Sequence, residues 1–124
     1  MNSKFKGDIA LSKAIAYYME LQYEVLLPIG DKRPYDLVIE KDGKLQKVQC
    51  KYTSYKRNYG VYCVPLKVNG GNRSSGNIVK KYNKEDFDLL FVYTESGDKY
   101  NIPFNEVTAT GQLSLGKDVE RFKI

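Results

Sequence analysis

Two runs of residues joined by an Asp-Gly turn restrict the fold more than any other feature of the sequence. Tyr35 to Lys41 and Leu45 to Thr53 alternate apolar and polar residues in the way typical of half-buried β-strands. The connection Lys41-Asp42-Gly43-Lys44 contains the Asp-Gly pair that favours a tight type I′ turn. The two runs therefore predict a β-hairpin. Its two ends far from the turn must lie side by side, because the strands are antiparallel.

Polar residues gather at that end of the predicted hairpin. Asp36 lies near the start of the first strand, while Gln49 and Lys51 lie two residues apart near the end of the second. Residues i and i+2 of a strand share one face, and pairing of the strands brings Asp36 close to that face. A carboxylate, an amide oxygen and an ammonium are thus expected on one patch. A solvated sheet surface can carry the same three groups, so the pattern alone leaves both interpretations open.

These residue types suit a hard divalent cation. Mg²⁺ prefers oxygen ligands and keeps several waters, and the oxygens available here are Asp36 Oδ, Gln49 Oε and the backbone carbonyl of Cys50. Lys51 would then hold or help to deprotonate an attacking water and neutralise charge on a phosphate. The sequence contains no histidine, which excludes a histidine base, a histidine metal ligand and a Ser-His-Asp triad.

Positive charge is concentrated in the middle third of the chain. The net charge is +5, but the segment from Gly43 to Lys84 contains ten of the 20 basic residues and none of the 15 acidic ones. Clustered Lys and Arg release the counterions condensed on nucleic-acid phosphates, so the segment predicts a polyanion partner. The tyrosines interleaved with these charges offer stacking surfaces, namely Tyr52, Tyr55, Tyr59, Tyr62 and Tyr82. A solvated basic face without a partner is the alternative.

Composition indicates a globular protein of one domain, residues 1–124. Hydrophobic residues make up 42% of the sequence and charged residues 28%, and the longest apolar runs are too short to span a bilayer. We therefore expect no membrane association. Cys50 and Cys63 have no CxxC spacing, which favours buried, reduced thiols over a zinc site or a disulfide. A cytoplasmic location is the default expectation, and no targeting segment is visible at the first residues.

The remaining elements complete an α+β order. Asp8 is a plausible N-cap for a helix from Ile9 to about Leu21, whose apolar stripe would pack on a sheet. Tyr23 to Ile29 and Gly60 to Leu66 are strand candidates, and a polar loop at residues 69–77 follows the second. A second hairpin is predicted from the runs Phe87 to Thr94 and Lys99 to Phe104 around a Gly-containing turn, and a short terminal segment closes the chain.

An ordered set of segments resembles a known family. Pro34-Tyr35-Asp36, followed after twelve residues by Gln49-Cys50-Lys51, resembles the PD-(D/E)XK nuclease signature with Gln in the usual acidic position. The likeness extends over roughly residues 6 to 107 and also includes Lys6-Gly7-Asp8-Ile9-Ala10, Tyr23 to Pro28, Asp86 to Leu90 and Tyr100 to Pro103. This order is similar to the small PD-(D/E)XK endonucleases that include cyanobacterial group I intron homing enzymes, and more remotely to archaeal Holliday-junction resolvases.

The resemblance implies an α+β, restriction-endonuclease-like fold with a mixed central β-sheet flanked by helices. It implies DNA as the substrate, phosphodiester hydrolysis with Mg²⁺, for which Mn²⁺ can substitute, and a homodimer or homotetramer that cuts two strands. Asp36 would be the metal-binding carboxylate, Gln49 the substitute for the second acidic residue and Lys51 the motif lysine. Five basic residues are expected to hold the DNA backbone: Lys56, Arg57, Arg73, Lys80 and Lys81. The two arginines are also the best candidates for reading base edges.

One departure from the family pattern concerns the first helix. Many relatives carry a Glu at what corresponds to Leu11 here, and leucine cannot bind a cation. Asp8 lies three residues earlier and could serve as a catalytic acid on the same helix face, although the N-cap role competes with this, and Ser12 is adjacent. Three functions therefore stay open: a homing-type endonuclease, a resolvase-type nuclease, and a DNA-binding module whose nuclease centre has decayed.

Overall fold

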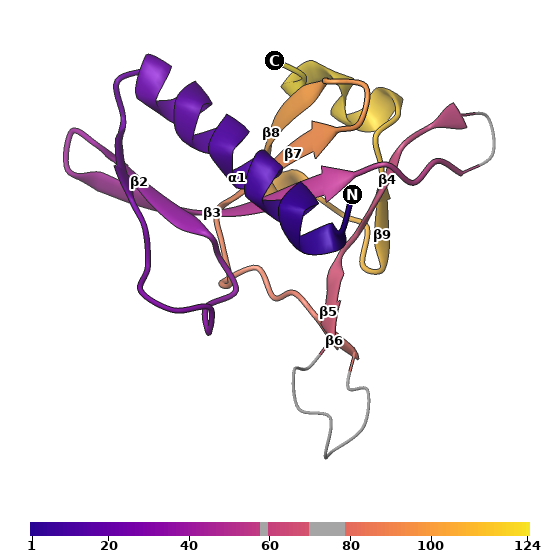
Figure 1. Cartoon of the computed structure of the whole chain (residues 1–124), viewed down its shortest axis with the longest axis horizontal. Helices are drawn as coiled ribbons and strands as arrows, with labels where there is room; N and C mark the ends of the chain where they lie inside the picture. The colour runs from indigo at the N-terminus through magenta and orange to yellow at the C-terminus, as the bar shows by residue number, and fades with distance from the viewer. Residues whose placement is uncertain (58–59, 70–78) are drawn as a thin grey trace.

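The computed structural model describes residues 1–57, 60–69 and 79–124 (Figure 1). One long helix precedes the strands, and two short 3₁₀ helices lie near the C-terminus. In chain order the elements are α1 (Ser3–Glu20), β1 (Glu24–Leu26), β2 (Leu37–Lys41), β3 (Lys44–Thr53), β4 (Cys63–Pro65), β5 (Lys67–Asn69), β6 (Val79–Lys81), β7 (Leu89–Thr94), β8 (Lys99–Pro103), η3 (Phe104–Glu106), β9 (Gln112–Ser114) and η4 (Lys117–Phe122).

Five strands form the central sheet in the order β1-β2-β3-β7-β8. β3 and β7 pair in parallel, whereas the other neighbours are antiparallel, so the sheet is mixed. The predicted β2–β3 hairpin is confirmed: Lys41 pairs with Lys44, and both turn residues have positive φ, 53° at Asp42 and 81° at Gly43. Such angles define the type I′ turn, which glycine adopts without steric cost.

Each face of the sheet has its own apolar cluster. Helix α1 crosses one face (Figure 1) and buries Ala10, Ala14 and Tyr18 there, against Leu37, Ile39, Val48, Cys50, Leu89 and Phe91. The opposite face is covered by the small β4–β9 sheet and the C-terminal 3₁₀ helices, through a cluster that includes Phe87, Leu90, Val92, Ile102 and Phe104. The predicted α+β class with a mixed central sheet is confirmed.

The helix begins earlier than the sequence predicted. It starts at Ser3, and the side-chain oxygen of Asn2 accepts a hydrogen bond from the Phe5 amide at 2.8 Å, which is the N-cap contact. The N-cap role predicted for Asp8 is therefore wrong, since Asp8 lies inside the helix on its exposed side. Gly7 does not interrupt the helix, because the tertiary packing of the following turns outweighs its weak helix propensity. Within the part of the chain that the structure describes, no helix has the length and hydropathy to span a bilayer.

Two predicted strands are shorter than expected. The run from Tyr23 to Ile29 forms only the three residues of β1, because Pro28 and the turn at Gly30 follow at once, and the run from Gly60 to Leu66 forms only β4. The second hairpin is confirmed as β7 and β8, with Leu89 paired to Pro103. Most of the polar loop predicted at residues 69–77 lies outside the described residues.

Candidate active site

The candidate site lies where β2 and β3 separate. Their pairing starts at Leu37 with Val48, so β3 continues from Gln49 to Thr53 beside β7 alone. Asp36 stands at this fork. Its amide donates to the Val48 carbonyl at 2.8 Å, and its Oδ2 accepts from the Cys50 amide, also at 2.8 Å. The carboxylate thus accepts the hydrogen bond from β3 that the backbone of a neighbouring strand would otherwise accept.

The Cys50 carbonyl and the Gln49 amide lie at the same edge. The N–H and C=O of one strand residue point to the same side, so the Cys50 carbonyl points towards the side on which its N–H meets Asp36. Gln49, only 9% exposed, donates from Nε2 to this carbonyl at 3.4 Å. In this orientation the amide nitrogen of Gln49 faces the carbonyl, and a half turn of the amide would place Oε1 there instead. The Asp36 carboxylate, the Cys50 carbonyl and the Gln49 amide therefore lie at the same edge of β3.

Burial perturbs the two ionisable groups of the site in opposite directions. It raises the pKa of Asp36, against the smaller lowering effects of the Cys50 amide hydrogen bond and the Lys51 charge. It lowers the pKa of Lys51, against the smaller raising effect of Asp36. Each shift arises because desolvation disfavours the charged form. Lys51 therefore releases its proton more readily than an exposed lysine, as a group that exchanges protons with a water must.

A pocket of about 240 Å³ adjoins Asp36, and helix α1 contributes Leu11 to its wall. The structure thus puts leucine where the resemblance implies a glutamate, and the helix presents an apolar side chain to Asp36. Asp8 lines neither this pocket nor the one described next, and the Ser12 hydroxyl donates to the Asp8 backbone carbonyl at 2.9 Å. The structure does not bring Asp8 together with the residues at the fork.

A second pocket, of about 280 Å³, lies at the N-terminal end of α1. Lys6 and Gly7 of the helix line it together with Cys50, Lys51 and Tyr52 of β3, and Ser3 and Ser54 complete its wall. The Lys6 ammonium lies 3.4 Å from the Ser54 hydroxyl and 5.6 Å from the centre of the Tyr52 ring. Sequence reasoning missed that Lys6 lines a pocket together with β3, because it started the helix at Ile9; the Asn2 cap was the available signal.

The donor set at the fork fits a hard, mostly hydrated cation. Asp36 uses one oxygen for the Cys50 amide, and its other oxygen has no hydrogen bond in the described part of the chain. Nowhere in residues 1–57, 60–69 and 79–124 do three or more Asp, Glu, Cys or His side chains form a metal-binding group. With a single carboxylate, a cation here would keep several waters, as Mg²⁺ does.

The residues predicted to contact DNA are only partly placed. Lys56, Arg57 and Lys81 are exposed, and the Lys56 ammonium lies 4.7 Å from the centre of the Tyr62 ring. Lys80 belongs to β6 and its side chain is not described, while Arg73 lies outside the described residues.

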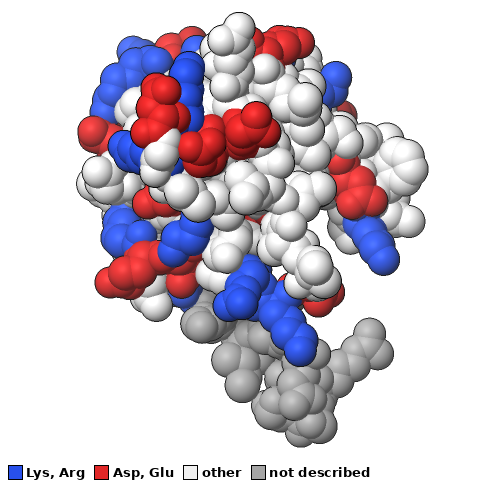
Figure 2. Space-filling model, turned by 90° about the vertical axis from the view of Figure 1, so that its left-hand side faces the viewer, with Lys and Arg blue, Asp and Glu red and all other residues white. Residues whose placement is uncertain are grey.

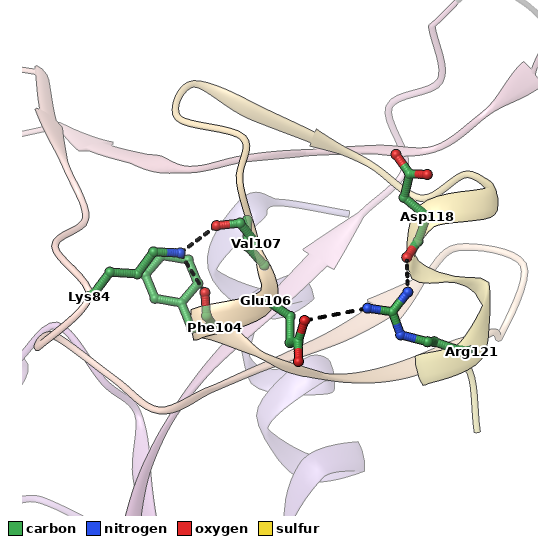
Figure 3. Close-up of polar contacts among 6 residues, drawn as sticks. All are labelled: Lys84, Phe104, Glu106, Val107, Asp118 and Arg121. Carbon is green, nitrogen blue, oxygen red and sulfur yellow. Dashed lines mark hydrogen bonds and ion pairs between the residues drawn. The ribbon is translucent and has the colours of Figure 1, made fainter.

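Other basic residues of the middle third serve the fold. Lys84 donates to the backbone carbonyls of Phe104 and Val107 and so fixes the turn after β8, beside the Glu106–Arg121 ion pair (Figure 3). Lys47 donates in the same way to the Glu85 carbonyl at 2.5 Å. Figure 2 shows that the face at the left of Figure 1 mixes acidic and basic side chains. The positive surplus of the sequence therefore overstates the charge that is free for a polyanion.

A mixed sheet with a carboxylate and a lysine at a strand fork is the arrangement that the family resemblance implies. The family model of PD-(D/E)XK endonucleases matches residues 1–118. The chain belongs to the PD-(D/E)XK endonuclease family, whose members generally use divalent metal ions. It is 29% identical to Protein 5.3 of Escherichia phage T7 over 126 residues, covering 100% of each chain.

A solved structure supports the same assignment. The bacterial homing endonuclease I-Ssp6803I superposes with a TM-score of 0.80 at 30% sequence identity, over 98% of this chain and 82% of that one. This likeness includes both the central sheet and α1. It therefore supports the same fold class and the same nuclease class as the family model does.

Proposed function

We propose that the protein is a Mg²⁺-dependent DNA endonuclease of the homing-endonuclease type. The observation that carries the proposal is the convergence of Asp36, the Cys50 carbonyl and the Gln49 amide at the β2–β3 fork, with Lys51 one residue further along β3. Cleavage would take place in the cytoplasm, where the buried free thiols Cys50 and Cys63 would stay reduced.

Each residue at the fork has a distinct part in hydrolysis. Asp36, Gln49 and the Cys50 carbonyl would hold Mg²⁺, or Mn²⁺ in its place, and the bound cation supplies positive charge for the scissile phosphate. Lys51, as the ammonium, holds the attacking water and neutralises charge on the scissile phosphate. The Cys50 amide keeps Asp36 in place through their 2.8 Å hydrogen bond.

DNA binding would use the exposed basic residues beyond β3. Lys56, Arg57 and Lys81, which are exposed, would contact the phosphate backbone, and Arg73 and Lys80 are proposed as further DNA contacts. Two strands of a duplex are cut most simply by two copies of one site, so we propose a homodimer or homotetramer.

A second candidate is a DNA-binding module of the same fold that no longer cuts. Leu11, which faces the Asp36 pocket in place of a glutamate, favours this function, because it leaves one carboxylate to hold the cation. Resolvase-type cleavage of branched DNA uses the same site, so the geometry does not distinguish it from duplex cleavage.

Cleavage assays separate these functions. Wild type and Asp36→Ala are compared on supercoiled plasmid and on a labelled four-way junction, with Mg²⁺, with Mn²⁺ or with EDTA. Metal-dependent product from wild type and none from Asp36→Ala is the expected result, and the preferred substrate distinguishes endonuclease from resolvase. DNA binding without cleavage by either protein would overturn the nuclease function and leave the binding module.

A further inference from the structure

The Lys51 ammonium needs a partner that holds it towards Asp36. A lysine side chain has a flexible four-carbon stem, and ordering it costs conformational entropy. Among the residues that the structure describes, this ammonium makes no hydrogen bond and no ion pair with a protein group. Its close contact is the ring of Tyr82, whose centre lies 5.3 Å from Nζ. An ammonium at this distance from an aromatic face is attracted by the negative face of the ring.

Tyr82 is well fixed by its neighbours. It directly follows β6, and its ring meets Phe87 edge-on, with centres 4.9 Å apart and planes inclined by 79°. Phe87 is fully buried and packs in turn on Phe104 at 4.2 Å. The ring near Lys51 is therefore the end of an aromatic row that belongs to the core, and the Lys51 side chain extends from β3 onto this ring.

The ring of Tyr82, and not its hydroxyl, is the part that acts on the site. The phenolic oxygen is buried and has no hydrogen-bond partner among the described residues, so a substrate at the surface does not reach it. Burial and the nearby charge of Asp36 raise the pKa of Tyr82 to about 12, so the group stays neutral at physiological pH. Replacement by phenylalanine would remove no described hydrogen bond and would keep the ring.

We propose that Tyr82 is a positioning residue of the nuclease site, whose ring holds the Lys51 ammonium in the orientation that cleavage requires. This inference rests on the proposed function. Without the ring, Lys51 samples several rotamers and reaches the attacking water in only a fraction of them. The expected loss is therefore in the rate of the chemical step and not in DNA affinity.

Single-turnover cleavage by wild type, Tyr82→Phe and Tyr82→Leu tests the proposal, with DNA affinity and Tm measured in parallel. Tyr82→Leu should cut about tenfold more slowly with unchanged DNA affinity, and Tyr82→Phe should keep the wild-type rate within about threefold. The matched control is Tyr23→Leu, which removes a ring from beneath another lysine, Lys41, at 5.0 Å and away from the fork. This control should cut as wild type does.

Two results would overturn the proposal: equal rates for Tyr82→Leu and wild type, or equal losses for Tyr82→Leu and Tyr82→Phe, since the second assigns the effect to the hydroxyl. NMR of lysine-labelled protein gives a readout without cleavage. The Lys51 ε-methylene protons should be shifted upfield by the Tyr82 ring in wild type and in Tyr82→Phe, but not in Tyr82→Leu. If wild type cuts no DNA, the proposed function fails, while this shift still decides whether Tyr82 holds Lys51.

Discussion

At the scale of single residues, the proposed role of Asp36 in the site comes at the expense of stability. Burial raises the pKa of its carboxyl, so the folded protein binds this proton more tightly than the unfolded chain does. Its favourable contribution to the free energy of unfolding is present below the ordinary pKa of aspartate. That contribution is lost as the pH rises through the raised pKa of the folded state. At neutral pH without metal, the ionised Asp36 therefore destabilises the fold.

Asp36→Asn should accordingly raise Tm at neutral pH in EDTA while it abolishes cleavage. The asparagine oxygen can still accept from the Cys50 amide, and the buried carboxylate charge is removed. Calorimetry from pH 3 to pH 8 should show that the advantage of the variant grows with pH. With excess Mg²⁺ the advantage should shrink, because only wild type gains binding free energy from the cation. A lower Tm for Asp36→Asn in EDTA at neutral pH would contradict this account.

Lys51→Met tests the motif lysine with nearly the same stem and no charge. Because Lys51 is proposed to act on the attacking water, the variant should cut at least about 100-fold more slowly and bind DNA within a few-fold of wild type. Lys44→Met, at the opposite end of β3, is the matched control and should cut normally. A parallel loss of cleavage and DNA affinity in Lys51→Met would assign Lys51 to DNA binding instead.

At the scale of elements, helix α1 and the β2–β3 hairpin together frame the site. The hairpin brings Asp36 to Cys50, and the early start of α1 brings Lys6 and Gly7 to the same end of β3. The first turns of the helix therefore belong to the surroundings of the site, although their residues have no part in the motif.

Asn2→Ala and Asp8→Ala should differ in their effect on the helix. Asn2→Ala removes the cap of the Phe5 amide and should lower the free energy of unfolding by about 1 kcal/mol. Asp8→Ala, at an exposed position within the helix, should change it by less than about 0.5 kcal/mol. Urea unfolding measures both. Normal cleavage by Asp8→Ala is also expected, and loss of cleavage would return Asp8 to the site.

At the scale of the whole molecule, the basic side chains available to DNA are those that the fold leaves exposed. Lys47 and Lys84 are bound to backbone carbonyls, whereas Lys56, Arg57 and Lys81 are exposed. The DNA-binding surface is therefore expected to depend on a smaller set of residues than the ten basic positions of the middle third.

A triple variant, Lys56→Ala with Arg57→Ala and Lys81→Ala, tests this surface. Each lost phosphate contact should reduce the slope of log affinity against log salt by about 0.9, so the triple variant should lose roughly 2 to 3 in slope. Fluorescence anisotropy over a range of salt concentrations measures it. Replacement of Lys84 by alanine should instead lower Tm, since its hydrogen bonds hold the turn after β8. An unchanged slope in the triple variant would place DNA elsewhere.

Local patterns in the sequence were sufficient for the elements built from neighbouring residues. The β2–β3 and β7–β8 hairpins follow from alternation and turn residues, and the approach of Asp36 to Gln49 and Lys51 follows from the first hairpin alone. The family signature lies within the same hairpin, and together with the other similar segments over roughly residues 6 to 107 it was sufficient to identify the family from the sequence.

Contacts between distant segments were decided by the tertiary structure. The parallel pairing of β3 with β7 leaves no local signal, since its partners lie about forty residues apart. Three placements depend on how α1 and the core pack on the two faces of the sheet: Leu11 in the pocket of Asp36, Lys6 in the pocket that β3 also lines, and the Tyr82 ring near the Lys51 ammonium. Residue spacing specifies which side of a strand a group occupies, but only packing specifies what it meets there.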